Sequence, residues 1–161
     1  MVNICIYIPT YNRPKSLYKQ IKAITNQASN NKIRIVVNDN NSNNNCNDYL
    51  EQEFKNIEYR KNIYNIGGNA NILLGFLNAK INEFLWILSD DDYINENAIK
   101  NIIENVKSEY DIICINSINE IKKINIYSSD EYIKYDEIGR ISCIIYNMNV
   151  FSKYIENGFL F

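Results

Sequence analysis

The sequence predicts a single α/β domain in which helices flank a mostly parallel sheet. Short β-branched runs alternate with segments of helical periodicity over the first two-thirds of the chain, an alternation typical of parallel sheets. The length of 161 residues suits one domain. Hydrophobic residues make up 46% of the chain, which is enough to build a core.

Five strands are expected before residue 118, because five short runs are rich in β-branched or aromatic residues. They span Val2–Pro9, Lys32–Asp39, Asn56–Asn62, Glu83–Ser89 and Asp111–Ser117. Three helices are expected between them, because apolar residues recur there at helical spacing. The helices span Arg13–Gln27, Asn65–Lys80 and Asn95–Lys107. Pro14 suits the first turn of the first helix, and Asn95 is the expected N-cap of the third.

The alternation stops after Ser117. Two further strands are expected there, at Glu120–Ser129 and Gly139–Asn147, without a clear helix between them. A closing helix is expected at Asn149–Gly158. No internal repeat and no linker is evident, so the chain is expected to form one domain.

Composition and charge exclude several classes of function. The net charge is -2 and no basic stripe occurs, so a nucleic-acid partner is not expected. Histidine is absent, which excludes a Ser-His-Asp device and a His-ligated zinc site. The N-terminus lacks the features of a signal peptide, and no apolar run approaches the roughly 20 residues that cross a bilayer. We therefore expect a cytoplasmic protein, with a peripheral position at the inner face of the membrane left open.

The four cysteines show no metal-ligand spacing. They are Cys5, Cys46, Cys114 and Cys143, and three of them sit inside apolar runs. Buried, reduced thiols are the expected state, and a disulfide or a reactive thiol is the alternative.

Polar segments follow the first four expected strands. They read PTYNRP, NDNNSNNN, NIYNIGGNAN and SDDDY. In an open parallel sheet, ligands bind beyond the carboxyl ends of the strands, so these segments are expected to share one edge. Together they offer hydroxyls, amides, a cation, glycine backbone and carboxylates, and this convergence marks the candidate site.

The last of these segments holds three adjacent aspartates, Asp90, Asp91 and Asp92. Two carboxylates about 5 Å apart repel by roughly 3 kcal/mol at an effective dielectric near 20. At a partly buried strand end the three raise one another's pKa unless a cation compensates. Mg²⁺ and Mn²⁺ prefer oxygen ligands and suit that role. The alternative is that Asp91 and Asp92 cap the next helix or lie in water.

Each of the other segments has a functional and a purely structural interpretation. Asp39 is a candidate acceptor for a base N–H or a ribose hydroxyl, or else a helix or turn cap. Tyr11 is a candidate to stack on a base and Arg13 to meet a phosphate or the base edge, or both belong to a surface turn. Gly67 and Gly68 let backbone approach an anion near a helix N-terminus, or they simply begin the helix.

Four motifs occur in an order and spacing that resemble family 2 glycosyltransferases of the GT-A fold. They are IYIPTYNRPKSL, IVVNDNNS, NIGGNANILLGFLNA and FLWILSDDDYI, and they lie between Val2 and Val106. The resemblance implies transfer of a sugar, of hexosyl type, from a nucleotide-sugar to an acceptor hydroxyl, with inversion. The SDDD form is similar to bacterial members that build lipopolysaccharide, capsule or other surface polysaccharides.

The resemblance also implies a set of site residues. The nucleotide-sugar is bound by Pro9, Thr10, Tyr11, Arg13, Asp39, Gly68, Asn71, Asp90 and Asp91. Within that set Asp39 meets the base and Asp90 lies near the ribose. Asp92, with Asp90, holds a Mg²⁺ or Mn²⁺ ion that bridges the diphosphate and stabilises the charge on the leaving group. The implied partners are a UDP-sugar donor and a glycan or lipid-linked acceptor.

No residue is assigned as the general base that an inverting enzyme needs. The carboxylates considered for it, none of them in a motif, are Glu120, Asp130, Glu131, Asp136 and Glu137. We therefore expect a C-terminally truncated chain, in which residues 1–117 are the donor-binding half and residues 118–161 begin the acceptor side. The alternative is a nucleotide-sugar-binding fragment or scaffolding module without turnover. Association into homo-oligomers is left open, because the chain ends in the apolar sequence GFLF.

Overall fold

The computed structural model describes residues 3–27, 33–43, 50, 52–115, 125–127 and 141–157. Within these residues, seven strands form one sheet in the order β3-β2-β1-β4-β7-β5-β6. The strands are β1 (Asn3–Thr10), β2 (Ile33–Asp39), β3 (Ile57–Lys61), β4 (Glu83–Ile87), β5 (Ile112–Cys114), β6 (Asn125–Tyr127) and β7 (Ile144–Asn147). The helices are α1 (Pro14–Gln27), α3 (Gly68–Asn78), α4 (Ala98–Asn105) and α6 (Met148–Glu156), and a short 3-10 helix, η1 (Ile141–Cys143), precedes β7.

Five of the seven described strands run in the same direction. β1 pairs in parallel with β2 and β4, and β2 pairs in parallel with β3. β7 is antiparallel to both β4 and β5, and β6 is antiparallel to β5. The prediction of a mostly parallel α/β sheet flanked by helices is confirmed, and β7 enters between β4 and β5 against the common direction.

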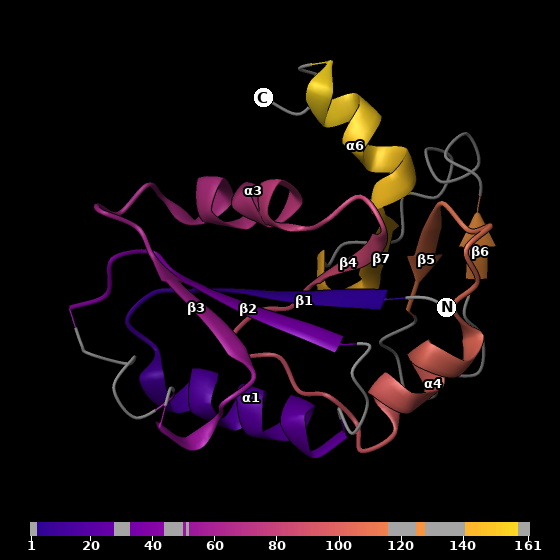
Figure 1. Cartoon of the computed structure of the whole chain (residues 1–161). Helices are drawn as coiled ribbons and strands as arrows, with labels where there is room; N and C mark the ends of the chain where they lie inside the picture. The colour runs from indigo at the N-terminus through magenta and orange to yellow at the C-terminus, as the bar shows by residue number, and fades with distance from the viewer. Residues whose placement is uncertain are drawn as a thin grey trace.

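Helices cover both faces of the sheet, with α1 and α4 on one face and α3 and α6 on the other (Figure 1). Alternate residues of β1 serve the two cores, as the period of two of a strand requires. Ile4, Ile6 and Ile8 pack in the core with α1 and α4, whereas Cys5 and Tyr7 pack with α3 and α6. Because both faces are buried, the centre of β1 is apolar throughout. Among the helices that the structure describes, none is both long and apolar enough to span a membrane.

Most element boundaries lie within a few residues of the expected ones, with two clear differences. α4 begins at Ala98 and its N-cap is Asn97, so the expected N-cap at Asn95 is wrong. The Asn95 carbonyl instead accepts the Ala98 N–H (3.0 Å) and the Gln27 side-chain amide (2.9 Å), which makes it part of the preceding turn. Of the expected strand Gly139–Asn147, the described residues form η1 first and are extended only from Ile144 onward, in β7.

Some sequence predictions fall outside the described residues. Of the strand expected at Glu120–Ser129, only β6 is described, and the carboxylates considered for a general base lie outside, as does Cys46. Cys5, Cys114 and Cys143 are buried free thiols, in agreement with the expected state. Burial raises the pKa of Cys5 to about 12 and that of Cys114 to about 11, so neither is a reactive thiolate.

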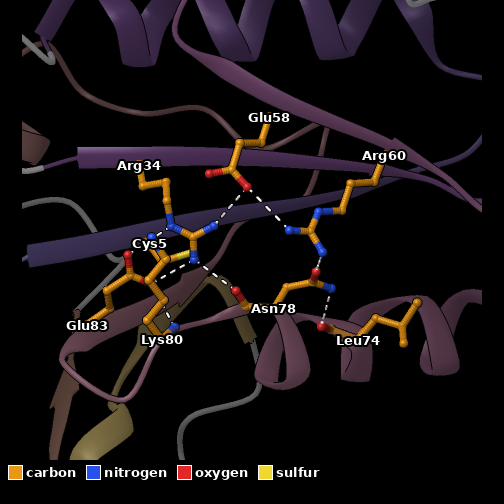
Figure 2. A network of polar contacts seen from close by, with 8 residues as sticks. All are labelled: Cys5, Arg34, Glu58, Arg60, Leu74, Asn78, Lys80 and Glu83. Atoms are coloured by element: carbon orange, nitrogen blue, oxygen red, sulfur yellow. Dashed lines mark hydrogen bonds and ion pairs between the residues drawn. The ribbon is translucent and has the colours of Figure 1, made fainter.

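A largely buried ion pair fastens β2 to β4 at their amino ends, next to the last turn of α3 (Figure 2). Arg34 donates from Nε and Nη2 to the two carboxylate oxygens of Glu83, at 2.8 and 2.7 Å. Nη2 also donates to the Asn78 carbonyl (2.9 Å), and Nη1 reaches Glu58 on β3 (3.1 Å). Burial acts to raise the pKa of Glu83, but Arg34 and the Lys80 backbone N–H outweigh it, so the pKa of Glu83 is lowered. Nη2 also contacts Cys5 Sγ on β1 (3.3 Å), so one guanidinium joins four strands and a helix at the edge opposite the candidate site.

Glu83→Gln is expected to lower the free energy of unfolding by about 3 kcal/mol, because it leaves the Arg34 charge beside an uncharged amide in a largely buried site. The matched control is Glu58→Gln, whose carboxylate also bonds Arg34 but is 44% exposed. We expect this control to lose under about 1 kcal/mol. Urea titration at neutral pH measures both variants, and equal losses would contradict the importance given to Glu83.

The same ion pair predicts how stability depends on acid. Because the pKa of Glu83 is lowered in the folded chain, its stabilising effect is complete above the ordinary value of 4.5 and is lost as the pH falls below it. Across this pH range, the free energy of unfolding of the wild type should fall more steeply with decreasing pH than that of Glu83→Gln. Parallel curves for the two proteins would contradict the assignment.

Candidate functional site

The polar segments that were expected to converge do meet at the carboxyl edge of the parallel strands. Thr10 and Asp39, which end β1 and β2, are register partners in adjacent strands. Beyond β4 the chain stays beside β1, where the Leu88 N–H donates to the β1 backbone (2.9 Å), and it then turns at Asp90. The Asn40 N–H donates to the Thr10 carbonyl (2.9 Å), which joins the loops after β1 and β2.

Asp90 is the most buried of the three adjacent aspartates, with 3% of its surface exposed. Thr10 Oγ1 donates to its Oδ2 (2.6 Å), and Arg13 Nη1 donates to its Oδ1 (3.1 Å). Burial raises the pKa of Asp90, and the hydrogen bonds from Thr10 and Arg13 offset this only in part. The carboxylate is therefore fixed in position, and burial disfavours its charged form.

Asp91 and Arg13 form the outer, solvent-facing part of the cluster. Arg13 Nη1 donates to Asp91 Oδ2 at 2.6 Å, and the Ser89 hydroxyl donates to Asp91 Oδ1. The hydrogen bond from Ser89 is the main cause that lowers the pKa of Asp91, and Arg13 adds to it. The side chains of Arg13 and Asp91 are 54% and 52% exposed, so water screens this pair and little energy is lost when it separates.

Asp92 bonds a different part of the chain. Its Oδ2 accepts the Ser89 N–H (3.1 Å) and the hydroxyl of Ser142 in η1. Trp86 on β4 donates from Nε1 to the Ser142 carbonyl (2.8 Å), which holds η1 against the strand. Sequence reasoning did not single out Ser142, because only the antiparallel pairing of β7 with β4 brings it here and nothing local in the sequence indicates that pairing.

Asp39 is fully buried and organises the loop after β2. Its Oδ1 accepts from the backbone N–H and the hydroxyl of Ser42 (2.9 and 2.5 Å), and its Oδ2 accepts the Tyr59 hydroxyl (2.7 Å). The Ser42 hydroxyl oxygen accepts the Asn12 N–H (2.7 Å) from the loop after β1. Asp39 thus caps the turn in this arrangement, and its contact with a base stays a prediction.

Five asparagines form a hydrogen-bonded group between β2, β3 and α3, here called the asparagine cluster. Its members are Asn38, Asn40, Asn62, Asn65 and Asn71. Asn71 Oδ1 accepts from the side chains of Asn38 (2.6 Å) and Asn62 (3.0 Å), and Asn71 Nδ2 donates to the Asn38 carbonyl (3.0 Å). Asn40 accepts from Asn62 (3.0 Å) and donates to Asn65 (2.8 Å). The cluster holds the entry to α3 in place, and the abundance of asparagine in the chain concealed it from sequence reasoning.

Other members of the predicted donor-binding set lie at or next to the edge. Pro9 is the penultimate residue of β1, and Tyr11 is 42% exposed. Gly68 begins α3, and Cβ atoms placed on Gly67 and Gly68 would meet nothing within 4 Å, so the backbone there is open to a ligand. Gly67 has a φ of +86°, which favours glycine. Asn71 is 2% exposed, with its amide engaged inside the asparagine cluster.

The oxygen donors at this edge fit a hard divalent cation whose shell is completed by a ligand. Asp90 and Asp92 supply carboxylates, and Mg²⁺ commonly takes one or two carboxylates together with phosphate oxygens. Across the described residues, no three side chains of His, Cys, Asp or Glu are grouped so as to hold a metal ion. A cation would therefore take its remaining ligands from a diphosphate or from water.

A mixed sheet covered by helices, with carboxylates, an arginine and open glycine backbone at the carboxyl edge, defines an α/β domain, a class in which ligands bind beyond the carboxyl ends of the strands. A family model described as Glycosyl transferase family 2 matches residues 5–155. The chain belongs to that family, as its motifs predicted. A comparison with curated protein sequences finds no match.

Solved glycosyltransferase structures share the GT-A fold of this chain. S. aureus TarS 1–349 matches with a TM-score of 0.70 at 19% identity, over 96% of this chain and 49% of that chain. The same protein in complex with UDP-GlcNAc matches with a TM-score of 0.68 at 19% identity, over 96% and 48%. The mannosyltransferase PcManGT from Pyrobaculum calidifontis, in complex with GDP-Man and Mn²⁺, matches with a TM-score of 0.59 at 14% identity, over 68% and 34%. This chain therefore spans half or less of the length of each of these structures.

Asn71→Asp is expected to lower the free energy of unfolding by about 2 kcal/mol, because a carboxylate oxygen would face the Asn38 carbonyl in a buried site. The matched control is Asn69→Asp, which is exposed in the first turn of the same helix, where negative charge is favoured. Urea unfolding should place this control at or above wild-type stability. Equal losses in the two variants would show that α3 itself, rather than the asparagine cluster, is sensitive to charge.

Proposed function

We propose that this chain forms the donor-binding part of a glycosyltransferase that moves a sugar from a nucleoside-diphosphate sugar to an acceptor hydroxyl. The observation that carries the proposal is the gathering of Thr10, Arg13, Asp90 and Asp92 at one edge of a family 2 domain. Residues 1–117 are proposed as the donor-binding half, and residues 118–161 as the beginning of the acceptor side.

A UDP-sugar is the proposed donor. Similar structures contain UDP, UDP-GlcNAc or GDP-Man, which share a nucleoside diphosphate and, in two cases, a hexose. Tyr11, being partly exposed, offers a face on which a base can stack, and Asp39, the last residue of the neighbouring β2, is proposed to meet the base. Asp90 is proposed to accept from the ribose, because its position is already fixed by Thr10 and Arg13.

The chemistry that these residues must support is the departure of a nucleoside diphosphate. Arg13 is proposed to exchange its exposed partner Asp91 for a phosphate, which a guanidinium binds strongly. The open backbone at Gly67 and Gly68 begins α3, whose positive end also favours an anion. When bound, Mg²⁺ or Mn²⁺ supplies Lewis-acid stabilisation of the departing diphosphate, and Asp92 with Asp90 is proposed to hold it.

The remaining features of the proposal come from the sequence motifs. Transfer is proposed to invert the anomeric centre, with a glycan or lipid-linked acceptor entering from the side of η1 and β7. The pathway is proposed to be the synthesis of bacterial polysaccharide or lipopolysaccharide, in the cytoplasm or at the inner face of the membrane. The general base stays unassigned.

A second candidate is a nucleotide-sugar-binding module without turnover. It is favoured by one feature of the sequence: none of the carboxylates considered for a general base sits in a motif that assigns it that role. Both candidates need the same donor site. They differ only in whether the sugar is cleaved from the bound nucleotide-sugar.

Asp92→Asn is expected to abolish the enhancement of UDP binding by Mn²⁺, because it removes a charged cation ligand and keeps the side-chain volume. Calorimetry of the 161-residue chain with UDP, with and without Mn²⁺, measures this, and a loss of at least about tenfold in apparent Mn²⁺ affinity is expected. Glu96→Gln, an exposed carboxylate four residues further on, is the matched control and should behave as wild type. If Mn²⁺ enhanced UDP binding in Asp92→Asn as much as in the wild type, the assignment of Asp92 as a metal ligand would be contradicted.

Turnover separates the two candidates. The chain incubated with a UDP-hexose and Mn²⁺ should release free sugar slowly, because water can replace the acceptor in a glycosyltransferase that binds its donor productively. Chromatographic detection of the sugar, with Asp92→Asn as the inactive reference, makes the measurement. Tight Mn²⁺-dependent binding without any release above that reference would favour the binding module.

A further inference from the structure

Ser142 reaches the aspartate loop because of the register between β4 and β7. The two strands are antiparallel and pair Phe84 with Asn147 and Trp86 with Ile145. Extending this register past the end of β4 places Ser142 opposite Ser89, the residue that immediately precedes the aspartates. The pairing of β7 with β4 therefore places the Ser142 hydroxyl, in η1, at the carboxyl edge of the sheet.

Ser142 is fixed at two points. Its carbonyl accepts from Trp86 Nε1 at 2.8 Å, and its hydroxyl donates to Asp92 Oδ2. The Ser89 N–H donates to the same Oδ2 (3.1 Å) and lies 3.4 Å from Ser142 Oγ, which closes a small ring of hydrogen bonds. Across the described residues, no hydrogen bond reaches Asp92 Oδ1. One oxygen of the carboxylate is thus anchored, and the other is left to meet a ligand.

We propose that Ser142 is a positioning residue for the divalent cation: it orients Asp92 so that the free carboxylate oxygen faces the ion. The inference rests on the proposed function, in which Asp92 is a metal ligand. A hydroxyl is well suited to this task, because it directs a carboxylate without neutralising it, whereas a lysine or arginine would compete with the ion for charge. Removing a residue that hydrogen-bonds a metal-ligating carboxylate commonly lowers metal affinity about 10- to 100-fold.

The position of Ser142 in the chain implies that the cation site and the acceptor side are coupled. Ser142 belongs to the segment proposed to begin the acceptor side, whereas Asp92 belongs to the donor side. Because η1 packs on Trp86 and bonds Asp92, the cation site is complete only when β7 has paired with β4. Any displacement of η1 by an acceptor would then change cation affinity, and cation binding would change acceptor affinity by the same factor.

Three variants of the full 161-residue chain test the role of Ser142. Ser142→Ala removes the hydroxyl, and Ser142→Thr keeps it. Thr25→Val removes a partly buried hydroxyl that bonds only the backbone of α1, so it is the matched control. Electron paramagnetic resonance of free Mn²⁺ in the presence of saturating UDP gives the Mn²⁺ affinity, and calorimetry without metal gives the UDP affinity.

Ser142→Ala should weaken Mn²⁺ binding about tenfold or more, while UDP affinity without metal and the melting temperature stay near wild type. Ser142→Thr should restore most of the Mn²⁺ affinity, and Thr25→Val should not differ from wild type. If the alanine variant does not fold, Ser142→Cys replaces it in the comparison. Cysteine keeps nearly the same side-chain volume, but its thiol is only a weak hydrogen-bond donor.

The outcomes separate this inference from the proposed function. Wild-type Mn²⁺ affinity in Ser142→Ala, together with its loss in Asp92→Asn, would overturn the role of Ser142 and leave the metal site intact. If Ser142→Ala lost as much UDP affinity in the absence of metal as it lost Mn²⁺ affinity, the role of Ser142 would be merely structural. That result would also overturn the inference. Absence of Mn²⁺ binding in the wild type would overturn the metal assignment and the role of Ser142 together.

Discussion

At the end of β4, three adjacent carboxylates each accept from one hydroxyl donor, and two of them also share one guanidinium. The hydroxyls belong to Thr10, Ser89 and Ser142 in the order of the aspartates, and Arg13 bridges the first two aspartates. Charges about 5 Å apart in such a site repel by roughly 3 kcal/mol, and these donors offset that repulsion. The donors come from the end of β1 and the loop after it, from the β4 loop itself and from η1, and the site therefore depends on the pairing of β4 with both β1 and β7.

The parallel part of the sheet and the location of the site could be predicted from the sequence. β1, β2 and β4 are buried on both faces, so each appears as a continuous apolar run with a polar segment behind it. Parallel strands bring their carboxyl ends to one edge, which makes neighbours of segments that are far apart in the sequence. Asp90 and Arg13 were predicted to belong to one site on this ground, and the structure places them in direct contact.

The roles of buried polar residues could not be predicted, because they depend on contacts that no local pattern encodes. Asp39 and Asn71 carry functional groups suited to a ligand, yet their side chains mainly bond the protein itself. Ser142 acts through the register of two strands that are distant in the sequence. Asn95 has the residue type of an N-cap, but the helix begins three residues later, since its carbonyl is used in the preceding turn. In each case tertiary packing decides between two interpretations that the residue type permits equally.

Anomalous diffraction from crystals of the chain grown with UDP and Mn²⁺ would test the cation site most directly, because it locates the ion independently of activity. The expected result is an Mn²⁺ peak about 2.1 Å from a carboxylate oxygen of Asp92, beside the diphosphate of UDP. Arg13 is expected to have moved from Asp91 toward a phosphate. UDP bound at this edge with no Mn²⁺ near Asp92, or Mn²⁺ bound at a different part of the chain, would contradict the assignment.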